Sequence, residues 1–224
     1  MRVSSIYPMI QGEGKNVGVP MWMIRLQGCP LKCKLCDSKY TWDPNGGTEM
    51  SINEIIEEVK KCNLDWVDIS GGEPLYQETE LYCLILRLMN TTKMKIEIET
   101  SGFYPPPKWW GVECWSVDWK MRSSGGESKA LNKWLSVLSE FDSIKCVVSD
   151  ADELNLILKN KPITKASLII SPVIWDIKET SGEIIVGKEQ LKWIRTVYQF
   201  CQDNNLRFSM QNHKLVFGQE RRDV

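Results

Sequence analysis

Apolar and polar positions follow two different periods along the chain. Residues 51–62 repeat apolar side chains at helical spacing, and Ser51 and Glu54 form a capping-box pattern at the start of this segment. Residues 21–28 and 66–70 are instead short, mainly apolar runs, which are typical of buried strands. The chain therefore alternates between strand-like and helix-like segments from its first third onward.

This alternation continues to the end of the chain. Helices are predicted at residues 51–62, 79–90, 129–141, 150–160 and 188–204. Strands are predicted at residues 21–28, 66–70, 95–102, 114–120, 143–149, 165–171 and 206–211. Strands that alternate with helices imply a parallel sheet with crossover helices. A closed eight-fold barrel typically needs about 250 residues, whereas this chain has 224. We therefore expect an α/β fold, an open or incomplete (β/α) barrel of about six or seven mainly parallel strands, formed by a single domain over residues 1–224.

Composition and charge narrow the class of protein. The chain is 42% hydrophobic and 25% charged, as is usual for soluble globular proteins. Its net charge of −1 provides no general attraction to nucleic acid or to an anionic membrane. No segment approaches the roughly 20 apolar residues of a membrane span, and the first residues do not resemble a signal peptide. We expect a cytoplasmic protein that binds neither nucleic acid nor membrane.

Three cysteines lie close together in the segment GCPLKCKLCDSKYTWD, residues 28–43, at C-x3-C-x2-C spacing. Three thiolates can hold an iron–sulfur cluster and leave one iron without a protein ligand. A structural zinc site is the alternative, but it needs four ligands, and the one histidine, His213, is distant in sequence. The remaining cysteines are isolated and are predicted to fill the core: Cys62, Cys83, Cys114, Cys146 and Cys201.

Other chemically useful residues follow the predicted strands. SGGEP (70–74), ETSG (99–102), DWKMRSSGG (118–126) and SPV (171–173) each come directly after a strand. In parallel sheets, ligands bind at the carboxyl ends of the strands. Any one of these loops could be polar and glycine-rich simply because it is a loop. Because the cysteine loop is predicted at the same edge of the sheet, we interpret these four loops and the cysteine loop together as one functional site.

The cysteine spacing after the first strand, together with GGEP after the second, resembles the radical S-adenosylmethionine (SAM) superfamily. Within it, the segments IQGEGKNVGVPMWMIRLQGC, CDSKYTWD, ISGGEP and ETSG resemble the 7-carboxy-7-deazaguanine synthases. VDWKMRSSG, IISPV and RFSMQNHK match that family more loosely, so the similarity runs over most of the chain. The resemblance implies a barrel of the radical SAM type.

The resemblance also implies an activity. Members of this family are carbon–nitrogen lyases that use a [4Fe–4S] cluster, SAM and Mg²⁺. They convert 6-carboxy-5,6,7,8-tetrahydropterin to 7-carboxy-7-deazaguanine by a radical ring contraction with loss of ammonia, on the route to queuosine and archaeosine. A homodimer and an electron donor of the flavodoxin or ferredoxin type are implied as partners. Two alternatives stay open: an activating enzyme for a glycyl-radical protein, and a catalytically silent metal-binding scaffold.

Site residues carry over position by position. The implied cluster ligands are Cys29, Cys33 and Cys36, and the implied magnesium ligand is Ser38. The implied contacts of SAM are Leu35, Cys36, Asp37, Gly71, Gly72, Glu73, Asp118, Trp119, Lys120, Ser171, Pro172, Val173 and Ile174. The implied contacts of the pterin substrate are Ile10, Gln11, Gly12, Arg25, Ser70 and Val224. The implied catalytic residues are Arg25, which suits a substrate carboxylate, and Glu13, which would assist proton movement.

Three positions in two segments depart from the family pattern. Ser38 stands where many members have threonine; it keeps the hard oxygen that magnesium prefers but lacks the methyl group that restricts the rotamer. Asp118 and Trp119 stand where a serine–proline pair is common before the lysine. A weaker requirement for magnesium and altered SAM contacts are therefore expected.

Overall fold

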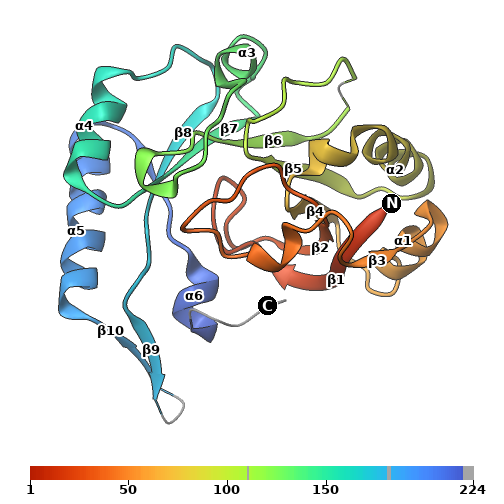
Figure 1. The fold of residues 1–224 in the computed structure, drawn as a ribbon, viewed down its shortest axis with the longest axis horizontal. Coiled ribbons are helices and arrows are strands. Elements are labelled where there is room, and N and C mark those ends of the chain that lie inside the picture. Colours follow the sequence, from red (N-terminus) through yellow and green to blue (C-terminus); the bar gives the residue numbers. More distant parts are fainter. Residues whose placement is uncertain (110, 181–182, 219–224) are drawn as a thin grey trace.

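The computed structural model describes residues 1–109, 111–180 and 183–218 (Figure 1). Its strands are β1 (Arg2–Ile10), β2 (Pro20–Leu26), β3 (Thr48–Glu49), β4 (Trp66–Gly71), β5 (Lys95–Thr100), β6 (Cys114–Asp118), β7 (Ser143–Val148), β8 (Ser167–Pro172), β9 (Ile177–Thr180), β10 (Glu183–Val186) and β11 (Arg207–Phe208). Its α-helices are α1 (Ile52–Val59), α2 (Glu78–Thr91), α3 (Leu131–Leu135), α4 (Ala151–Lys159), α5 (Lys188–Asp203) and α6 (Asn212–Phe217). Short 3-10 helices are η1 (Lys39–Thr41), η2 (Pro74–Gln77) and η3 (Arg122–Ser124).

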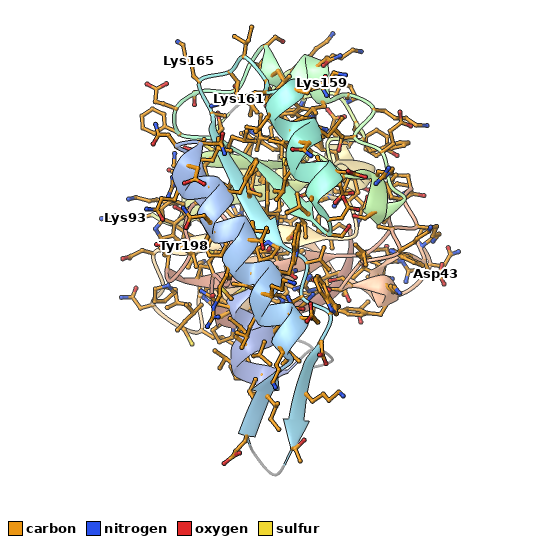
Figure 2. The ribbon with its side chains drawn as sticks, turned by 90° about the vertical axis from the view of Figure 1, so that its left-hand side faces the viewer. Asp43, Lys93, Lys159, Lys161, Lys165 and Tyr198 are labelled. Atoms are coloured by element: carbon orange, nitrogen blue, oxygen red, sulfur yellow. The ribbon has the colours of Figure 1, made fainter. Side chains whose placement is uncertain are left out.

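One large sheet organises these elements. Its strand order is β11-β8-β7-β6-β5-β4-β2-β1-β3. Strands β2, β4, β5, β6, β7, β8 and β11 run parallel, and they are the seven strands predicted from the sequence. The predicted α/β fold with a mainly parallel open sheet is thus confirmed. β1 and β3 add antiparallel pairings at one edge, and β9 and β10 form a separate hairpin that projects from the rest (Figures 1 and 2).

Alternate residues of the parallel strands face two different environments. One set joins the apolar core beneath the helices and includes Ile24, Ile69, Ile98, Val117 and Ile144, all fully buried. The residues in between carry many of the polar side chains of the sheet: Arg25, Asp68, Ser70, Glu97, Glu99, Ser116, Asp118, Lys145 and Ser171. Parallel strands in α/β proteins are usually apolar on both faces. A concave face with this many polar groups indicates a binding site.

The first and last parts of the chain meet across the open side of the sheet. The loop between β1 and β2 accepts a hydrogen bond at Gly12 O from Asn212 N, 3.0 Å away. In the same loop, Gly14 N donates to Ser209 Oγ over 3.0 Å. A Cβ at Gly12 would lie 2.8 Å from His213 Nδ1, so only glycine allows this approach. These contacts join the segment before β2 to the segment after β11.

Helix ends follow local chemistry. The predicted capping box is confirmed: Glu54 N donates to Ser51 Oγ, and Ser51 N donates to Glu54 Oε2. The helix predicted over residues 129–141 is wrong in length, because α3 ends at Leu135. Asp142 accepts hydrogen bonds from both the amide and the hydroxyl of Ser139, which folds the chain into a turn before β7.

The isolated cysteines divide into two groups. Cys114, Cys146 and Cys201 are buried as predicted, whereas the prediction is wrong for Cys62 and Cys83, which are exposed. Cys62 follows the end of α1, and Cys83 lies on α2 outside the face formed by the buried residues Leu81, Leu84, Ile85 and Leu88. Within the described residues, no helix combines the length and apolar character that crossing a membrane requires.

Candidate active site

A cavity of about 660 Å³ opens at the carboxyl ends of the parallel strands. It collects residues from the β1–β2 loop, the loop after β2, the ends of β4 to β7, the segment after β8 and α6. Of the residues singled out in the sequence, those that line it are Ile10, Gln11, Gly12, Glu13, Arg25, Cys29, Cys33, Leu35, Cys36, Asp37, Ser38, Ser70, Gly71, Gly72, Asp118, Trp119, Lys120, Val173 and Ile174. Segments distant in sequence thus share one cavity, as expected for an α/β protein.

Backbone hydrogen bonds hold the cysteine loop in place. Gly28 N donates to Thr41 O over 2.7 Å, which closes the loop on itself. Lys34 N donates to Ser124 O over 2.7 Å, which fixes the loop to the segment after β6. Gly126 of that segment lies so near that a Cβ there would be 2.5 Å from Cys33 Sγ. The loop is therefore attached at its base and at its middle.

The thiols suit coordination by a cluster. Burial raises the pKa of Cys29 to about 11 and also raises the pKa of Cys33, although nearby Lys120 opposes the shift at Cys33. Both thiols are neutral at pH 7 without metal, and coordination would deprotonate them. No three His, Cys, Asp or Glu side chains within the described ranges converge as ligands of a single metal ion. This disfavours zinc, whereas an iron–sulfur cluster needs its three thiolates spread around a larger body.

The glycines after β4 bring the backbone close to the cavity. Gly72 N donates to Leu26 O over 3.0 Å, which extends the β2–β4 pairing. A Cβ at Gly72 would lie 2.2 Å from Gly28 O, so a larger residue would push the strand ends apart. Gly71 has φ +129°, a conformation that favours glycine. Without side chains, these two residues leave their backbone as the surface that a ligand would contact.

Glu73 lies outside the cavity lining and has a different environment. Its carboxylate is fully buried and accepts hydrogen bonds from Leu75 N at 3.1 Å and from Thr100 Oγ1 and Ser101 N, both at 2.8 Å. The hydroxyl of Ser101 also donates to it. Burial raises the pKa of Glu73, and these donors oppose that shift. Glu73 thus joins the end of β4 to the end of β5, beside the cavity.

Arg25 lies at the centre of a second cluster of contacts. Its Nη1 donates to Ser38 Oγ over 2.9 Å, and its Nη2 donates to Tyr7 Oη over 2.8 Å. Its Nε is buried without a hydrogen-bond partner among the described residues. Nearby, Ser70 Oγ donates to Glu99 Oε2 over 3.0 Å. A half-buried guanidinium that lines the cavity and has an unused donor fits an anionic ligand.

Lys145, in the middle of β7, was not predicted as a site residue. Its Nζ lies 3.2 Å from Glu13 Oε1, and 3.8 Å from both Glu99 Oε1 and Asp118 Oδ1. Asp118 also pairs with Lys120. Burial works to lower the pKa of Lys145, but the three carboxylates outweigh it and raise the pKa well above its usual value. The sequence feature that could have identified Lys145 is its position as a charged residue within a buried, mainly apolar strand.

The last helix also contributes residues that the sequence did not single out. Lys214 Nζ lies 2.7 Å from Asp37 Oδ1, and Gln211 Nε2 donates to Asp37 Oδ2 over 2.9 Å. His213 lines the cavity without joining the cysteines, and burial lowers its pKa. The looser similarity of RFSMQNHK was the only sequence signal for this segment.

Two further predicted contacts are not found in the cavity lining. Ser171 and Pro172 end β8 directly before the lining residues Val173 and Ile174, and Ser171 Oγ is buried without a partner among the described residues. Val224 lies outside the described residues.

A pair of acids lies deeper in the sheet. Glu97 Oε2 accepts a hydrogen bond of 2.9 Å from Asn16 Nδ2, and Asp68 Oδ2 accepts one of 3.2 Å from Gln11 Nε2. Burial, reinforced by Glu99, raises the pKa of Glu97 to about 7. Burial, again with Glu99, raises the pKa of Asp68 well above its usual value. The β1–β2 loop therefore covers carboxyl groups that the fold favours in their neutral form.

Comparisons with known proteins agree with this arrangement. Residues 10–105 match the family model described as a 4Fe-4S single cluster domain. The chain is 32% identical to the 7-carboxy-7-deazaguanine synthase of Koribacter versatilis (strain Ellin345), with all of both chains covered. It is 29% identical to the enzyme of the same name from Leptospira interrogans, over 98% of this chain and 96% of the relative. The crystal structure of QueE from Escherichia coli superposes with a TM-score of 0.68 at 24% identity, covering 95% of this chain and 94% of that one.

Proposed function

Because the chain belongs to the family of 7-carboxy-7-deazaguanine synthases, which are radical SAM enzymes, we propose that it converts 6-carboxy-5,6,7,8-tetrahydropterin to 7-carboxy-7-deazaguanine with loss of ammonia. One observation carries the proposal: the three cysteines, the Gly71–Gly72 backbone and the Arg25 guanidinium all line the same cavity. The product would serve 7-deazapurine synthesis, on the route to queuosine. A carbon–nitrogen bond is broken, so the reaction is that of a lyase.

Cys29, Cys33 and Cys36 would hold a [4Fe–4S] cluster, and three thiols without a fourth ligand fit a cluster with one open iron. Gly71 and Gly72 would present their backbone to the amino group of SAM. When bound, the cluster and SAM supply the radical that removes a hydrogen atom from C6 of the substrate. The contacts proposed for SAM beyond these are Leu35, Asp37, Asp118, Trp119, Lys120, Val173 and Ile174. For Glu73, Ser171 and Pro172, which are not among the lining residues, we propose support of the SAM site without contact.

Arg25 would bind the substrate carboxylate. Its guanidinium is already oriented by Tyr7 and Ser38, and its unused Nε donor remains for the ligand. Ile10, Gln11, Gly12 and Ser70 would hold the pterin ring.

Glu13 is proposed as the residue that moves a proton as ammonia leaves. Its Oε1 faces Lys145, and its Oε2 is buried without a partner among the described residues. This second oxygen is the atom that would accept the proton.

Ser38 would provide a protein ligand for Mg²⁺. Too few acidic side chains surround it in the described part of the chain to bind the ion alone. The remaining ligands would therefore be oxygens of the substrate and water, which suits the way magnesium usually binds. The ion would act as a Lewis acid on the substrate carboxylate.

The partners and setting are proposals as well. Cluster reduction needs an external electron donor, for which we propose a flavodoxin or a ferredoxin. We further propose a cytoplasmic homodimer in which residues 1–224 form a single domain.

The activity is tested anaerobically. The protein is reconstituted with iron and sulfide, then given SAM, dithionite, Mg²⁺ and 6-carboxytetrahydropterin, and 7-carboxy-7-deazaguanine is sought by mass. Product from the wild-type protein and none from Cys33→Ala is expected, because a missing ligand prevents cluster assembly. The matched control is Cys83→Ala, which removes an exposed thiol remote from the cavity and should leave the rate unchanged. SAM cleavage without this product would overturn the substrate assignment and redirect the search to a protein substrate.

A further inference from the structure

A triangle of polar side chains, with Lys214 and Gln211 buried and Asp37 42% exposed, connects α6 to the cysteine loop. Lys214 Nζ lies 2.7 Å from Asp37 Oδ1 and donates to Gln211 Oε1 over 3.0 Å. Gln211 Nε2 closes the triangle by donating to Asp37 Oδ2 over 2.9 Å. The side chain of Lys214 is only 5% exposed. Each side chain in the triangle contacts the other two, so the geometry of the three is fixed together.

The position of Asp37 makes this triangle relevant to the active site. Asp37 stands between Cys36, a proposed cluster ligand, and Ser38, the proposed magnesium ligand. Backbone hydrogen bonds hold the loop at Gly28, Lys34 and Thr41, and Cys36 N bonds to Cys33 O within the loop. Asp37 and its neighbour Ser38, which accepts a hydrogen bond from Arg25, therefore attach the C-terminal end of the cysteine loop to the rest of the fold.

α6 also contacts the proposed substrate loop. Asn212, at the start of α6, donates from its amide to Gly12 O, and His213 packs against Gly12. The helix thus contacts the loop of the proposed pterin site on one side and the cysteine loop on the other. A shift of either loop would have to move α6 or break one of these bonds.

We propose that Lys214 is a positioning residue, which holds the cysteine loop through Asp37 and Gln211 in the geometry that binds SAM. This inference rests on the proposed function. Lys214 is not proposed as a catalytic residue, because Asp37 neutralises its charge and two of its three donors already have partners within the triangle. A lysine paired in this way attracts a substrate anion less than Arg25 does.

The experiment uses the protein loaded with its cluster and measures SAM affinity by titration calorimetry without substrate. Lys214→Met and Gln211→Met each break the triangle while keeping a side chain of similar length. Both should retain the wild-type iron content and weaken SAM binding about tenfold, which equals about 1.4 kcal/mol. Lys214→Arg keeps the charge and should restore most of the affinity. Lys161→Met is the matched control, since Lys161 is exposed beyond the end of α4 and outside the cavity lining (Figure 2).

A second pattern of results would overturn the inference. If Lys214 contacts the substrate directly, SAM affinity stays at the wild-type value, and only Lys214→Met raises the KM for the pterin. Gln211→Met provides the test independently if Lys214→Met does not fold. Because SAM affinity is measured without substrate, the result is separate from the proposed function, which fails only if the wild-type protein makes no product.

Discussion

The guanidinium of Arg25 donates a hydrogen bond of 2.9 Å to the hydroxyl of Ser38. The family resemblance assigned these residues to different ligands, the substrate carboxylate and magnesium. In the structure they are direct neighbours across the loop after β2. Because the two side chains are neighbours, the proposed carboxylate site and the proposed magnesium site would form one subsite.

Removal of the Ser38 hydroxyl tests that subsite. Ser38→Ala should raise the Mg²⁺ concentration for half-maximal activity about tenfold, because one hard oxygen ligand is lost. Ser38→Thr keeps the oxygen and adds a methyl group that restricts the rotamer, so it should need less Mg²⁺ than wild type. Activity is measured across a magnesium titration with Ser136→Ala, a hydroxyl on the surface beyond α3, as the control. An unchanged magnesium response in Ser38→Ala would remove Ser38 from the metal site.

Lys145 should be essential for stability. Lys145→Met leaves Glu13, Glu99 and Asp118 facing one another without the cation they share. Loss of one partner from a buried ion pair typically costs about 3–5 kcal/mol. Urea denaturation followed by tryptophan fluorescence measures this loss, with the exposed Lys133→Met as the control. A change below about 1 kcal/mol would mean that water already screens these charges.

Gly126 should control cluster loading. Its φ is not in the left-handed region, so Gly126→Ala adds only a methyl group, which would meet Cys33 Sγ at 2.5 Å. The thiol must move, and we expect iron content after reconstitution to fall, with an overpacking cost of about 1–3 kcal/mol. Gly111→Ala is the matched substitution, since its Cβ would meet Met89 Sδ at an ordinary 3.5 Å. Wild-type iron content in Gly126→Ala would show that the cysteine loop can shift to accommodate the added methyl group and still bind the cluster.

Glu97 should make stability depend on pH. Its pKa is about 7 in the folded protein, chiefly because of burial, and about 4.3 in an unfolded chain. The folded state therefore holds the proton more tightly, and stability falls as the pH rises from about 4.3 to about 7. Glu97→Gln keeps an acceptor for Asn16 and removes this penalty.

The difference in unfolding free energy between Glu97→Gln and wild type should therefore grow over that pH range, by an amount on the order of 3 kcal/mol. Denaturation at several pH values from 5 to 8 measures it. Glu80→Gln, on the exposed side of α2, should give a constant difference. A constant difference for Glu97→Gln as well would mean that this carboxyl is ionised throughout.

Most of the parallel sheet could be predicted because its strands are short apolar runs between helices. β1 was missed, since its residues are mostly half-buried and its pattern is broken by Ser4, Ser5 and Pro8. β1 lies second from the edge of the sheet, between β2 and the two-residue strand β3, and runs antiparallel to both. The hairpin β9–β10 was missed for a related reason, because it lies outside the main sheet and buries little.

The site was predictable where chemistry is local in sequence. The cysteine loop, Gly71–Gly72 and Arg25 lie where strand ends place them. Lys145 and Lys214 are different, because their partners come from segments far away in sequence, and only the fold brings them together. Glu73 shows the opposite case: the motif identified it, but its carboxylate is occupied by Thr100 and Ser101.

The contacts that join the β1–β2 loop to Ser209 and Asn212 also set an order of events during synthesis. A nascent chain has exposed its three cysteines long before residues 209–214 leave the ribosomal tunnel. Until residues 209–214 have left the tunnel, the β1–β2 loop lacks its contacts with Ser209 and Asn212, and Asp37 lacks its partner Lys214 on α6. The three cysteines therefore leave the ribosome before Asp37 can form its contacts with Gln211 and Lys214, so the cysteine loop is made before the segment that holds it.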